Sequence, residues 1–503
     1  MESSKKERWS IPSRTQLIIC GFFVTLSCYI IRVDLNLALT AMVKPVNHTH
    51  QATQSNFSCF NSTLQPKKNQ TYHIVGQYDW DTKQQGLVLG AFYIGYTFGQ
   101  LPGSLAGHYF SPKKVLIIVH FIKAVCHLMI PVLTPYSYIY LVIIRALQGI
   151  LQGHEYPIFQ NIISNWIPPI ERSRSITAFF SGNLIGIVTA QVVTGYIANP
   201  YFHPDTGDYH SDWPYVFYLF GSYGIFVCIL MYFFFYDSPN CHPKISNREK
   251  IYIINAIRAG KGLMTEDEND EMEITNCEED SKTNKRPKEE RTKIPYKGIF
   301  SSVPFMSIIF THLANNWTFY TLITCLPTYM SGVLGISVKN NGVLSTLPYI
   351  VFWITSVFAS SLTDIVIRRK YISNTNMRKI NNSLTLVGSG GCLVAAGLFG
   401  CNINAVVIMF CLTNFFLGFG TSGYCTNIFE IGGRYAGMLF AISNTLASVP
   451  GLFGPLLVGY LTQNSSTVAE WMIVFYLSAG IGLFATIINL IFTVSKTQEW
   501  AKN

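Results

Sequence analysis

The side chains best suited to chemistry in this sequence are ionisable groups inside long apolar runs. They are Arg32, Asp34, His120, Lys123, His127, Arg145, His154 and Glu155. A charged group in the middle of a membrane costs about 3 kcal/mol or more, so each is a functional candidate. The second half of the chain has almost none, and we expect charge recognition mainly in the first half.

The run 138–162 is the most informative, because its polar residues follow a helical spacing. Positions i, i+3, i+7 and i+10 hold Arg145, Gln148, Gln152 and Glu155, which share one face of a helix. A buried guanidinium binds a carboxylate or phosphate through two hydrogen bonds. We predict that Arg145 binds an anion and that Glu155 carries a coupling proton, with His154 as a second proton candidate. The structural alternative is a gate or packing pair that binds nothing.

The run 15–43 contains a second arginine. Arg32 and Asn36 share one helix face, and we predict that both contact the substrate. Asp34 points away from that face, and we expect it to pair internally with Arg32 or Lys123. The run 114–134 also contains ionisable residues, for which we expect interhelical hydrogen bonds and snorkelling toward an interface. These residues are His120, Lys123 and His127.

Aromatic and small polar residues complete a candidate substrate path. We predict substrate contacts from Tyr93, Asn316, Tyr320, Ser443 and Asn444. The same path contains Tyr96, Tyr156, Asn315 and Trp317. Taken alone, each such residue is more often a hydrogen bond between helices than a ligand contact.

Membrane-spanning helices must position these residues. The chain has 503 residues, of which only 13% are charged and 49% are hydrophobic, whereas roughly 25% are charged in a soluble domain. A spanning helix needs about 20 mostly apolar residues. Twelve segments qualify, at roughly 15–43, 84–107, 114–134, 138–162, 175–198, 214–236, 302–326, 342–363, 381–401, 403–427, 436–461 and 471–493. The composition excludes a disordered chain, and the net charge of +9 forms no basic face for nucleic acid.

The loops predict how the chain is oriented. Lysines and arginines precede the first span and lie in the loops after the second, fourth and eighth spans. Because basic residues stay on the cytosolic side, we expect both termini there. The loop 44–82 on the opposite side has four acceptor sequons, at Asn47, Asn56, Asn61 and Asn69, and we expect a glycosylated lumenal loop.

An internal repeat divides the spans into two halves. Asp212-Trp213-x-x-Val216-Phe217-Tyr218-Leu219 opens the sixth span, and Glu470-Trp471-x-x-Val474-Phe475-Tyr476-Leu477 opens the twelfth. Two parallel six-helix halves with a midplane substrate site are the architecture of major facilitator transporters, so we predict this all-α membrane fold. The predicted order is a tail at 1–14, a bundle at 15–236, a cytosolic linker at 237–301, a second bundle at 302–493 and a tail at 494–503. In the linker we expect an amphipathic helix on the membrane surface at 246–258.

Several motifs resemble those of one transporter family. They are "IRVDLNLALTAMV", "LPGSLAG", "RALQG", "WIPPIERSR", "NNWTFYTLITCLPTYM", "LSTLPY" and "RYAGMLFAISNT". In this order they resemble the sialin, vesicular glutamate and type I phosphate transporter family over about residues 15–500. The run around Trp317 is most similar to the sialin branch.

The resemblance implies transport of organic anions driven by a proton gradient or membrane potential, with sodium-linked phosphate transport in some members. It matches Arg32 and Arg145 to the family's paired substrate-path arginines. Sialin-like members have proton-coupling glutamates at the positions of Gln148 and Gln152, and amides do not titrate. We therefore hypothesise that Glu155 replaces them.

Other departures concern the substrate and the gates. The vesicular glutamate members have an arginine at the position of Asn315 and a histidine at that of Leu89, so glutamate loading is disfavoured. We expect Glu430 to keep the family's acidic role near Arg434. The basic loops after the second and eighth spans are expected to lock the two conformations. The predicted gating residues are Asp364, Arg368, Glu430 and Arg434.

The sequence therefore predicts a monomeric secondary transporter of small organic anions, such as sialic-acid-like sugars or other carboxylates, working by alternating access and proton symport. We expect no enzyme activity and no cofactor beyond a coupling ion, H+ or Na+. The alternatives are a sodium-dependent phosphate transporter, a potential-driven anion transporter, and a non-transporting sensor or scaffold. The expected partners are the anion and the lipid bilayer, without nucleic acid, and lysosomal, vesicular and plasma membranes remain open.

Overall fold

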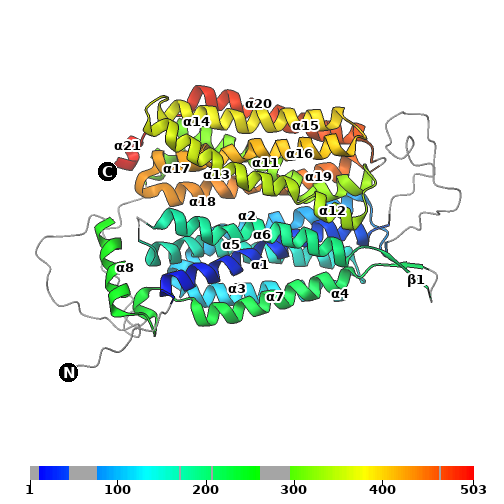
Figure 1. The fold of residues 1–503 in the computed structure, drawn as a ribbon, viewed down its shortest axis with the longest axis horizontal. Helices are drawn as coiled ribbons and strands as arrows, with labels where there is room; N and C mark the ends of the chain where they lie inside the picture. Colours follow the sequence, from blue (N-terminus) through cyan, green and yellow to red (C-terminus); the bar gives the residue numbers. More distant parts are fainter. Residues whose placement is uncertain are drawn as a thin grey trace, which may run out of the picture.

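The computed structural model describes residues 11–44, 76–168, 171–204, 208–260, 295–463 and 466–502. Most of these residues are helical (Figure 1). The predicted glycosylation sites, at Asn47, Asn56, Asn61 and Asn69, lie outside the described residues.

The first half of the chain provides six spans. They are α1 (Ser13–Met42), α2 (Thr82–Tyr109), α3 (Pro112–Leu128) with α4 (Ile130–Leu133), α5 (Tyr138–Trp166), α6 (Arg172–Ile197) and α7 (Trp213–Phe234). A short antiparallel hairpin of β1 (Tyr201–His203) and β2 (Asp208–His210) joins the last two. After α7 come η2 (Pro239–Cys241), α8 (Asn247–Gly260) and α10 (Tyr296–Phe300).

The second half provides the other six spans, most of which are interrupted. They are α11 (Val303–Gly332); α12 (Val338–Leu344) with α13 (Leu347–Arg368); α14 (Asn374–Ser383), η3 (Leu384–Gly388) and α15 (Ser389–Leu398); α16 (Ile403–Leu417), η4 (Gly418–Thr421) and α17 (Tyr424–Gly432); α18 (Ala436–Ser448), preceded by η5 (Gly433–Tyr435), with α19 (Pro450–Leu461); and α20 (Val468–Phe492). A final turn, α21 (Glu499–Lys502), follows. Helices α13 and α19 carry a proline in their first turn, where its missing N–H has no helical partner.

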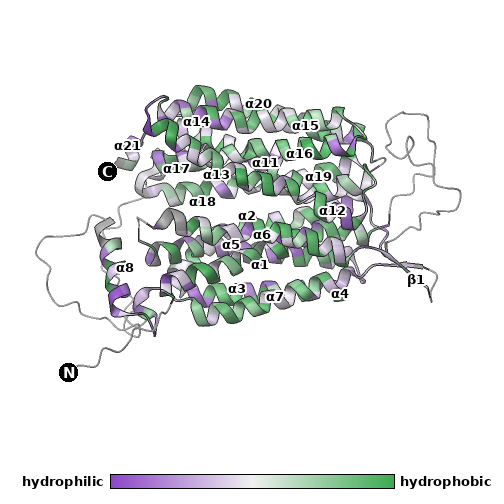
Figure 2. Ribbon diagram, in the orientation of Figure 1, coloured by the Kyte–Doolittle hydropathy of each residue, from purple (hydrophilic) through white to green (hydrophobic). Residues whose placement is uncertain are grey.

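Seven helices or joined helix pairs in the described ranges are by themselves long and apolar enough to cross a membrane. They are Ser13–Met42, Ser175–Ile197, Trp213–Phe234, Val338–Arg368, Ile403–Gly432, Ala436–Leu461 and Val468–Phe492. Figure 2 shows hydrophobic colour over most of the helices, while hydrophilic residues gather at the helix ends and on α8.

The two sets of spans form two layers in Figure 1, with α1–α7 below and α11–α20 above. The repeated tryptophans occupy matching places, because Trp213 begins α7, Trp471 lies in the first turn of α20, and each is only 2% exposed. The repeat therefore marks the last spanning helix of each layer.

Helices α2 and α5 pack unusually closely, and glycines make this possible. A Cβ atom on Gly149 would lie 1.9 Å from the carbonyl oxygen of Phe92, and one on Gly95 would lie 1.8 Å from that of Ala146. These backbones touch, so no side chain fits between them. This contact fixes the rotation of α5 relative to α2 and with it the direction of the polar side chains on both helices.

The linker helix α8 runs across the end of the spanning helices, at the end where α1 begins (Figure 1). The carboxylate of Glu249 accepts hydrogen bonds from the backbone N–H groups of Ser13 (3.0 Å) and Arg14 (3.2 Å), which begin α1. An acidic group is favourable at a helix N-terminus. Glu171 accepts from the Tyr252 hydroxyl at 3.0 Å and pairs with Arg14 at 3.1 Å. We call these four side chains, Arg14, Glu171, Glu249 and Tyr252, the α8 latch.

We predict that Gly149→Ala destabilises the protein by about 1–3 kcal/mol, because the added methyl group forces α2 and α5 apart. Gly391→Ala is the matched control, since Gly391 also lies inside a helix but has nothing within 4 Å of an added Cβ. Alanine raises helix propensity by about 1 kcal/mol, so the control should be neutral or more stable. Thermal unfolding of the purified protein in detergent measures both. Equal melting temperatures for the two variants would contradict the predicted close contact.

Candidate substrate site

Arg32 lies at the centre of a ring of aromatic side chains between the two layers. Its guanidinium carbon is 4.8–5.3 Å from five ring centroids. We call these rings the aromatic cage: Tyr29, Phe92, Tyr93, Tyr96 and Tyr320. Arg32 is 3% exposed, and its Nε and Nη2 atoms have no hydrogen-bond partner within the described part of the chain. Aromatic faces attract a cation but are poor hydrogen-bond acceptors for its N–H groups. The aromatic cage therefore holds a guanidinium whose N–H donors remain available for a ligand.

The aromatic cage contains residues from both halves. The Tyr93 and Tyr320 rings, from α2 and α11, have centroids 4.8 Å apart. Close to the cage, Asn36 donates its side-chain N–H to the carbonyl of Ile323 at 2.8 Å, which joins α1 to α11. A ligand at Arg32 would therefore touch both halves, as the predicted midplane site requires.

Further contacts between the halves run along α2. The Thr82 hydroxyl, at the start of α2, donates to the carbonyl of Gly459 in α19 at 2.8 Å. Further along, Gln100 accepts from the amide of Asn444 at 2.9 Å and donates to the Ser448 hydroxyl at 3.1 Å. The predicted substrate residue Asn444 thus forms a hydrogen bond between the halves in this conformation.

The second predicted arginine is held differently from the first. Arg145 donates to the backbone carbonyls of Ile31 (3.0 Å) and Arg32 (2.8 Å) and to Oε1 of Gln148 (3.2 Å). Its guanidinium carbon lies 5.0 Å from the Phe92 ring centroid, and that of Arg32 lies 5.1 Å from the same centroid. The two arginines are close, as the family resemblance implies. Both terminal nitrogens of Arg145 have acceptors and only its Nε lacks one, whereas Nε and Nη2 of Arg32 both lack acceptors among the described residues.

The predicted partner of Asp34 is wrong. Oδ2 of Asp34 lies 2.8 Å from Nε2 of His127, and both side chains are fully buried. Spacing along α1 correctly turned Asp34 away from the Arg32 face. It could not show that the neighbour on that side is His127 of α3 rather than Lys123, which lies about one helical turn away.

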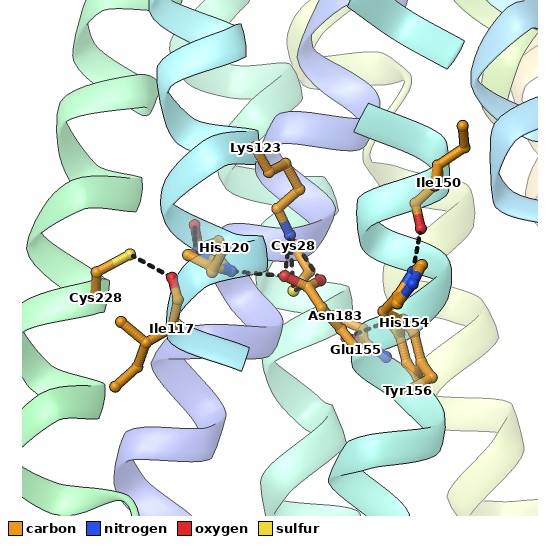
Figure 3. A network of polar contacts seen from close by, with 11 residues as sticks. Cys28, Ile117, His120, Lys123, Ile150, His154, Glu155, Tyr156, Asn183 and Cys228 are labelled. Carbon is orange, nitrogen blue, oxygen red and sulfur yellow. Dashed lines mark hydrogen bonds and ion pairs between the residues drawn. The ribbon is translucent and has the colours of Figure 1, made fainter. Parts of the chain in front are cut away.

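Three buried side chains surround the carboxylate of Glu155, and Figure 3 shows these four residues converging from three helices. We call them the charge cluster: Cys28 on α1, His120 and Lys123 on α3, and Glu155 on α5. Nζ of Lys123 lies 2.6 Å from each carboxylate oxygen, Nδ1 of His120 lies 2.8 Å from Oε1, and the Cys28 thiol donates to Oε2 at 2.9 Å. The prediction that the α3 residues form interhelical bonds is confirmed. The predicted snorkelling is wrong, because all three α3 side chains are 0% exposed.

The charge cluster has the side-chain types of a metal site, because the ligand atoms of Cys28, His120 and Glu155 lie within 4.8 Å of one another. The ammonium of Lys123 lies among them, 2.6 Å from both carboxylate oxygens and 3.4 Å from the Cys28 sulfur. A positive charge therefore already fills the position that a metal ion would take. We assign the charge cluster as an internal ion pair.

The two predicted proton carriers do not lie together. His154 bonds through Nδ1 to the carbonyl of Ile150 on its own helix at 2.7 Å, and Figure 3 shows its ring on the side of α5 away from Lys123. A role for Glu155 or His154 in proton coupling stays a prediction. In this conformation both carboxylate oxygens of Glu155 lie 2.6 Å from Nζ of Lys123.

Two of the predicted residues of the second half, Asn316 and Ser443, form hydrogen bonds within that half. Asn316 donates to the carbonyl of Ala447 at 3.0 Å, and the hydroxyl of Ser443 lies 2.8 Å from Nδ1 of His312. His312, 4% exposed and stacked on Tyr424 with centroids 4.5 Å apart, is a buried ionisable residue that sequence analysis missed. A histidine inside the apolar run of α11 was the available signal.

Gln152 is a second residue that sequence analysis did not assign to the substrate path. It is fully buried, and neither its amide oxygen nor its amide nitrogen has a partner among the described residues. A buried, unpaired amide costs free energy unless a ligand or water satisfies it. Its place on α5 between Gln148 and Glu155 makes it a candidate ligand contact.

One residue of the predicted gate forms an ion pair that sequence analysis did not name. Glu430 forms a bidentate ion pair with Arg378, with Nη2 to Oε1 at 2.6 Å and Nε to Oε2 at 3.0 Å. Arg378 of α14 is thus the partner shown, while the side chain of Arg434 lies outside the described residues. Asp364 and Arg368 on α13 are exposed, and within the described ranges Asp364 forms no ion pair. A gating role for Asp364 and Arg368 stays a prediction.

Comparison with known proteins agrees with this architecture. The model of the Major Facilitator Superfamily matches residues 17–436. A solved bacterial homolog of the human lysosomal transporter Spinster, in an inward-facing and occupied conformation, superposes with a TM-score of 0.66 at 13% identity, covering 96% of this chain and 97% of that one. A D-xylose-proton symporter gives a TM-score of 0.60 at 13% identity, over 96% and 99%. At these identities the likeness concerns the fold alone.

Sequence relatives are more specific. Human sialin is 32% identical over 98% of this chain and 91% of its own length. A putative inorganic phosphate cotransporter of Drosophila melanogaster is 31% identical over 94% and 83%. Vesicular glutamate transporter 3 of Danio rerio is 31% identical over 86% and 69%.

The fold and the matching family model define a multi-pass membrane transporter of the major facilitator superfamily, which is not an enzyme. Within that superfamily, the chain belongs to the family of sialin, the vesicular glutamate transporters and the putative inorganic phosphate cotransporters.

We predict that Glu155→Gln and Lys123→Met each lower the free energy of unfolding by about 3–5 kcal/mol, because each leaves a buried charge without its partner. The double variant should recover most of this loss, since it buries neither charge. Thermal unfolding of the four proteins in one detergent completes the cycle.

The same variants test the predicted proton role of Glu155. If Glu155→Gln unfolds like wild type, and its uptake no longer responds to a pH gradient, Glu155 is a proton carrier and the structural assignment fails.

Proposed function

We propose that this protein is a secondary active transporter of small organic anions, and that Arg32 in the aromatic cage is its main anion-binding group. The observation that carries the proposal is a buried guanidinium with unpaired donors. The basic side chains Lys123 and Arg145 already have partners in the charge cluster and on the α1 backbone. An anion is the partner that would complete the hydrogen bonding of Arg32.

The aromatic cage favours an organic anion over inorganic phosphate. Five rings offer large apolar faces, against which a sugar or another carbon skeleton can pack. A phosphate ion needs several hydrogen-bond donors and gains little from such faces. We therefore propose carboxylates with a carbon body, such as sialic acid or other acidic sugars.

We further propose that transport is coupled to protons by alternating access, with both termini in the cytosol. The buried ionisable residues of the first half provide titratable groups close to the arginines. Helix α8, the start of α1 and α21 lie at one end of the molecule (Figure 1), in keeping with basic loops on that side.

Uptake of labelled sialic acid into proteoliposomes with an imposed pH gradient tests the proposal. We expect saturable uptake by wild type and at least a tenfold loss in Arg32→Gln, because a hydrogen-bonded charge pair contributes about 1.5–3 kcal/mol. Arg14→Gln is the matched control, since Arg14 also lies over an aromatic ring, Tyr252 at 5.0 Å, but belongs to the α8 latch.

Phosphate uptake with a sodium gradient is the second arm of this experiment. Sodium-dependent phosphate uptake without sialic acid uptake would replace the proposal with the phosphate transporter alternative. Equal sialic acid uptake by Arg32→Gln and wild type would remove Arg32 from the site. The absence of either uptake would favour a non-transporting protein.

A further inference from the structure

The side chain of Gln148 is a hydrogen-bonded link between a histidine and the second arginine. Its Oε1 accepts from Nη1 of Arg145 at 3.2 Å, and its Nε2 lies 3.3 Å from Nδ1 of His127. All three side chains are buried, with exposures of 0–1%. On the other side of the imidazole ring, Nε2 of His127 lies 2.8 Å from the carboxylate of Asp34. The series Asp34, His127, Gln148 and Arg145 thus ends at the arginine that holds the α1 backbone.

The chemistry of the groups fixes which atoms donate. A guanidinium donates only, so the amide group of Gln148 must turn its oxygen toward Arg145. Its NH2 group then faces His127 and requires an acceptor there. Nδ1 of His127 is therefore unprotonated, and the ring is a neutral imidazole with its proton on Nε2, facing Asp34. This tautomer follows from the hydrogen-bond network.

Protonation of His127 is incompatible with this arrangement. The imidazolium would carry N–H donors on both nitrogens, so Nδ1–H would face the NH2 group of Gln148, which cannot accept. The amide must turn over to offer its oxygen to His127. Its NH2 group then faces the guanidinium of Arg145, which also only donates. The bond between Gln148 and Arg145 and the proton on Nδ1 of His127 therefore exclude each other.

We propose that Gln148 is a positioning residue that couples protonation of His127 to the release of Arg145 for the substrate anion. A proton from water binds Nδ1 of His127, the amide of Gln148 turns over, and Arg145 gains free donors next to the aromatic cage. Loss of the proton restores the bond and withdraws those donors. This inference rests on the proposed anion transport and names its proton-linked group.

The coupling depends on an amide at position 148. A carboxylate there would accept from Arg145 and from a protonated His127 at once, so the two events would not exclude each other. The amide that removes a titratable group from this helix face thus makes the neighbouring histidine the titrating group.

The other groups around His127 do not supply a competing switch. From α1 it faces Asp34, from α5 it faces Gln148 and Arg145, and from α7 it faces the Phe217 ring at 5.2 Å between centroids. On its own helix, α3, the nearest ionisable residues are Lys123 and His120, and both are paired with Glu155. Among the described residues that contact His127, Gln148 is thus the one whose side chain also forms a hydrogen bond with Arg145.

The decisive experiment compares two variants that should differ in opposite directions. Binding of labelled sialic acid to purified protein is measured between about pH 5 and about pH 8, the range in which a histidine changes charge. Wild type should bind about tenfold more weakly at the upper end, within the usual range of coupling between two sites. Gln148→Leu removes the bond to Arg145 and should bind tightly at all pH values. His127→Gln cannot be protonated and should bind weakly at all pH values.

His242→Gln is the control for loss of a histidine, because His242 lies just before α8, where its ring packs edge-to-face against Tyr236 with centroids 4.6 Å apart. Its pH dependence should equal that of wild type. A merely structural role for the series would weaken binding in both Gln148→Leu and His127→Gln without opposite effects on the pH profile. That result, or a wild-type pH dependence retained in Gln148→Leu, would overturn the inference.

A measurement without substrate separates this inference from the proposed function. Nitrogen NMR of protein with labelled arginine, with the Arg145 signal identified by its loss in Arg145→Lys, reports the surroundings of that guanidinium. In wild type the signal should change through the same pH transition as the imidazole of His127, and in Gln148→Leu it should not. If the two signals are linked but no anion binds, the proposed function fails alone. If sialic acid binds but the Arg145 signal does not follow His127, the coupling fails alone.

Discussion

A guanidinium taken out of water without a counter-anion is the constraint on which the centre of this molecule depends. Among the described residues of the first-half core, Lys123 pairs with Glu155, Asp34 with His127, and the terminal nitrogens of Arg145 with the α1 backbone and Gln148. Arg32 has instead a ring of aromatic faces, which tolerate a cation without neutralising it. The rest of the core can thus stay folded and electrically balanced while this single site remains ready for a negative charge.

Helix α2 connects that site to the remainder of the fold. It contributes three of the five rings of the aromatic cage, touches α5 backbone to backbone at glycines, and forms hydrogen bonds with α18 and α19. A ligand that moves Phe92, Tyr93 or Tyr96 would therefore act on both layers. The same helix that shapes the site also forms part of the surface along which the halves meet, so binding and rearrangement use one element.

Sequence analysis predicted the twelve spans and the buried ionisable residues, because hydropathy and helical spacing are local properties. The pairing of Arg32 and Arg145 was implied by the family resemblance and not by either property. Sequence analysis did not predict which buried side chains pair with one another. Arg145 and Glu155 are ten positions apart, which leaves them about 80° apart around a helix. That difference is enough for Arg145 to reach α1 while Glu155 reaches Lys123 on α3. The pairs of Asp34 with His127 and of Glu430 with Arg378 depend likewise on which helices become neighbours, and no spacing along one chain segment encodes that.

The α8 latch attaches the helix of the linker to the first half of the molecule. Because Glu249 accepts from the first N–H groups of α1, and Tyr252 and Arg14 both bind Glu171, helix α8 belongs structurally to the first bundle although it follows α7 in the chain. A division of the chain into its two bundles therefore keeps α8 with its partners when it falls after Gly260, and not when it falls after Phe234. A division there would keep the acidic cap on the first N–H groups of α1, whereas a division before α8 would place that cap on the other polypeptide.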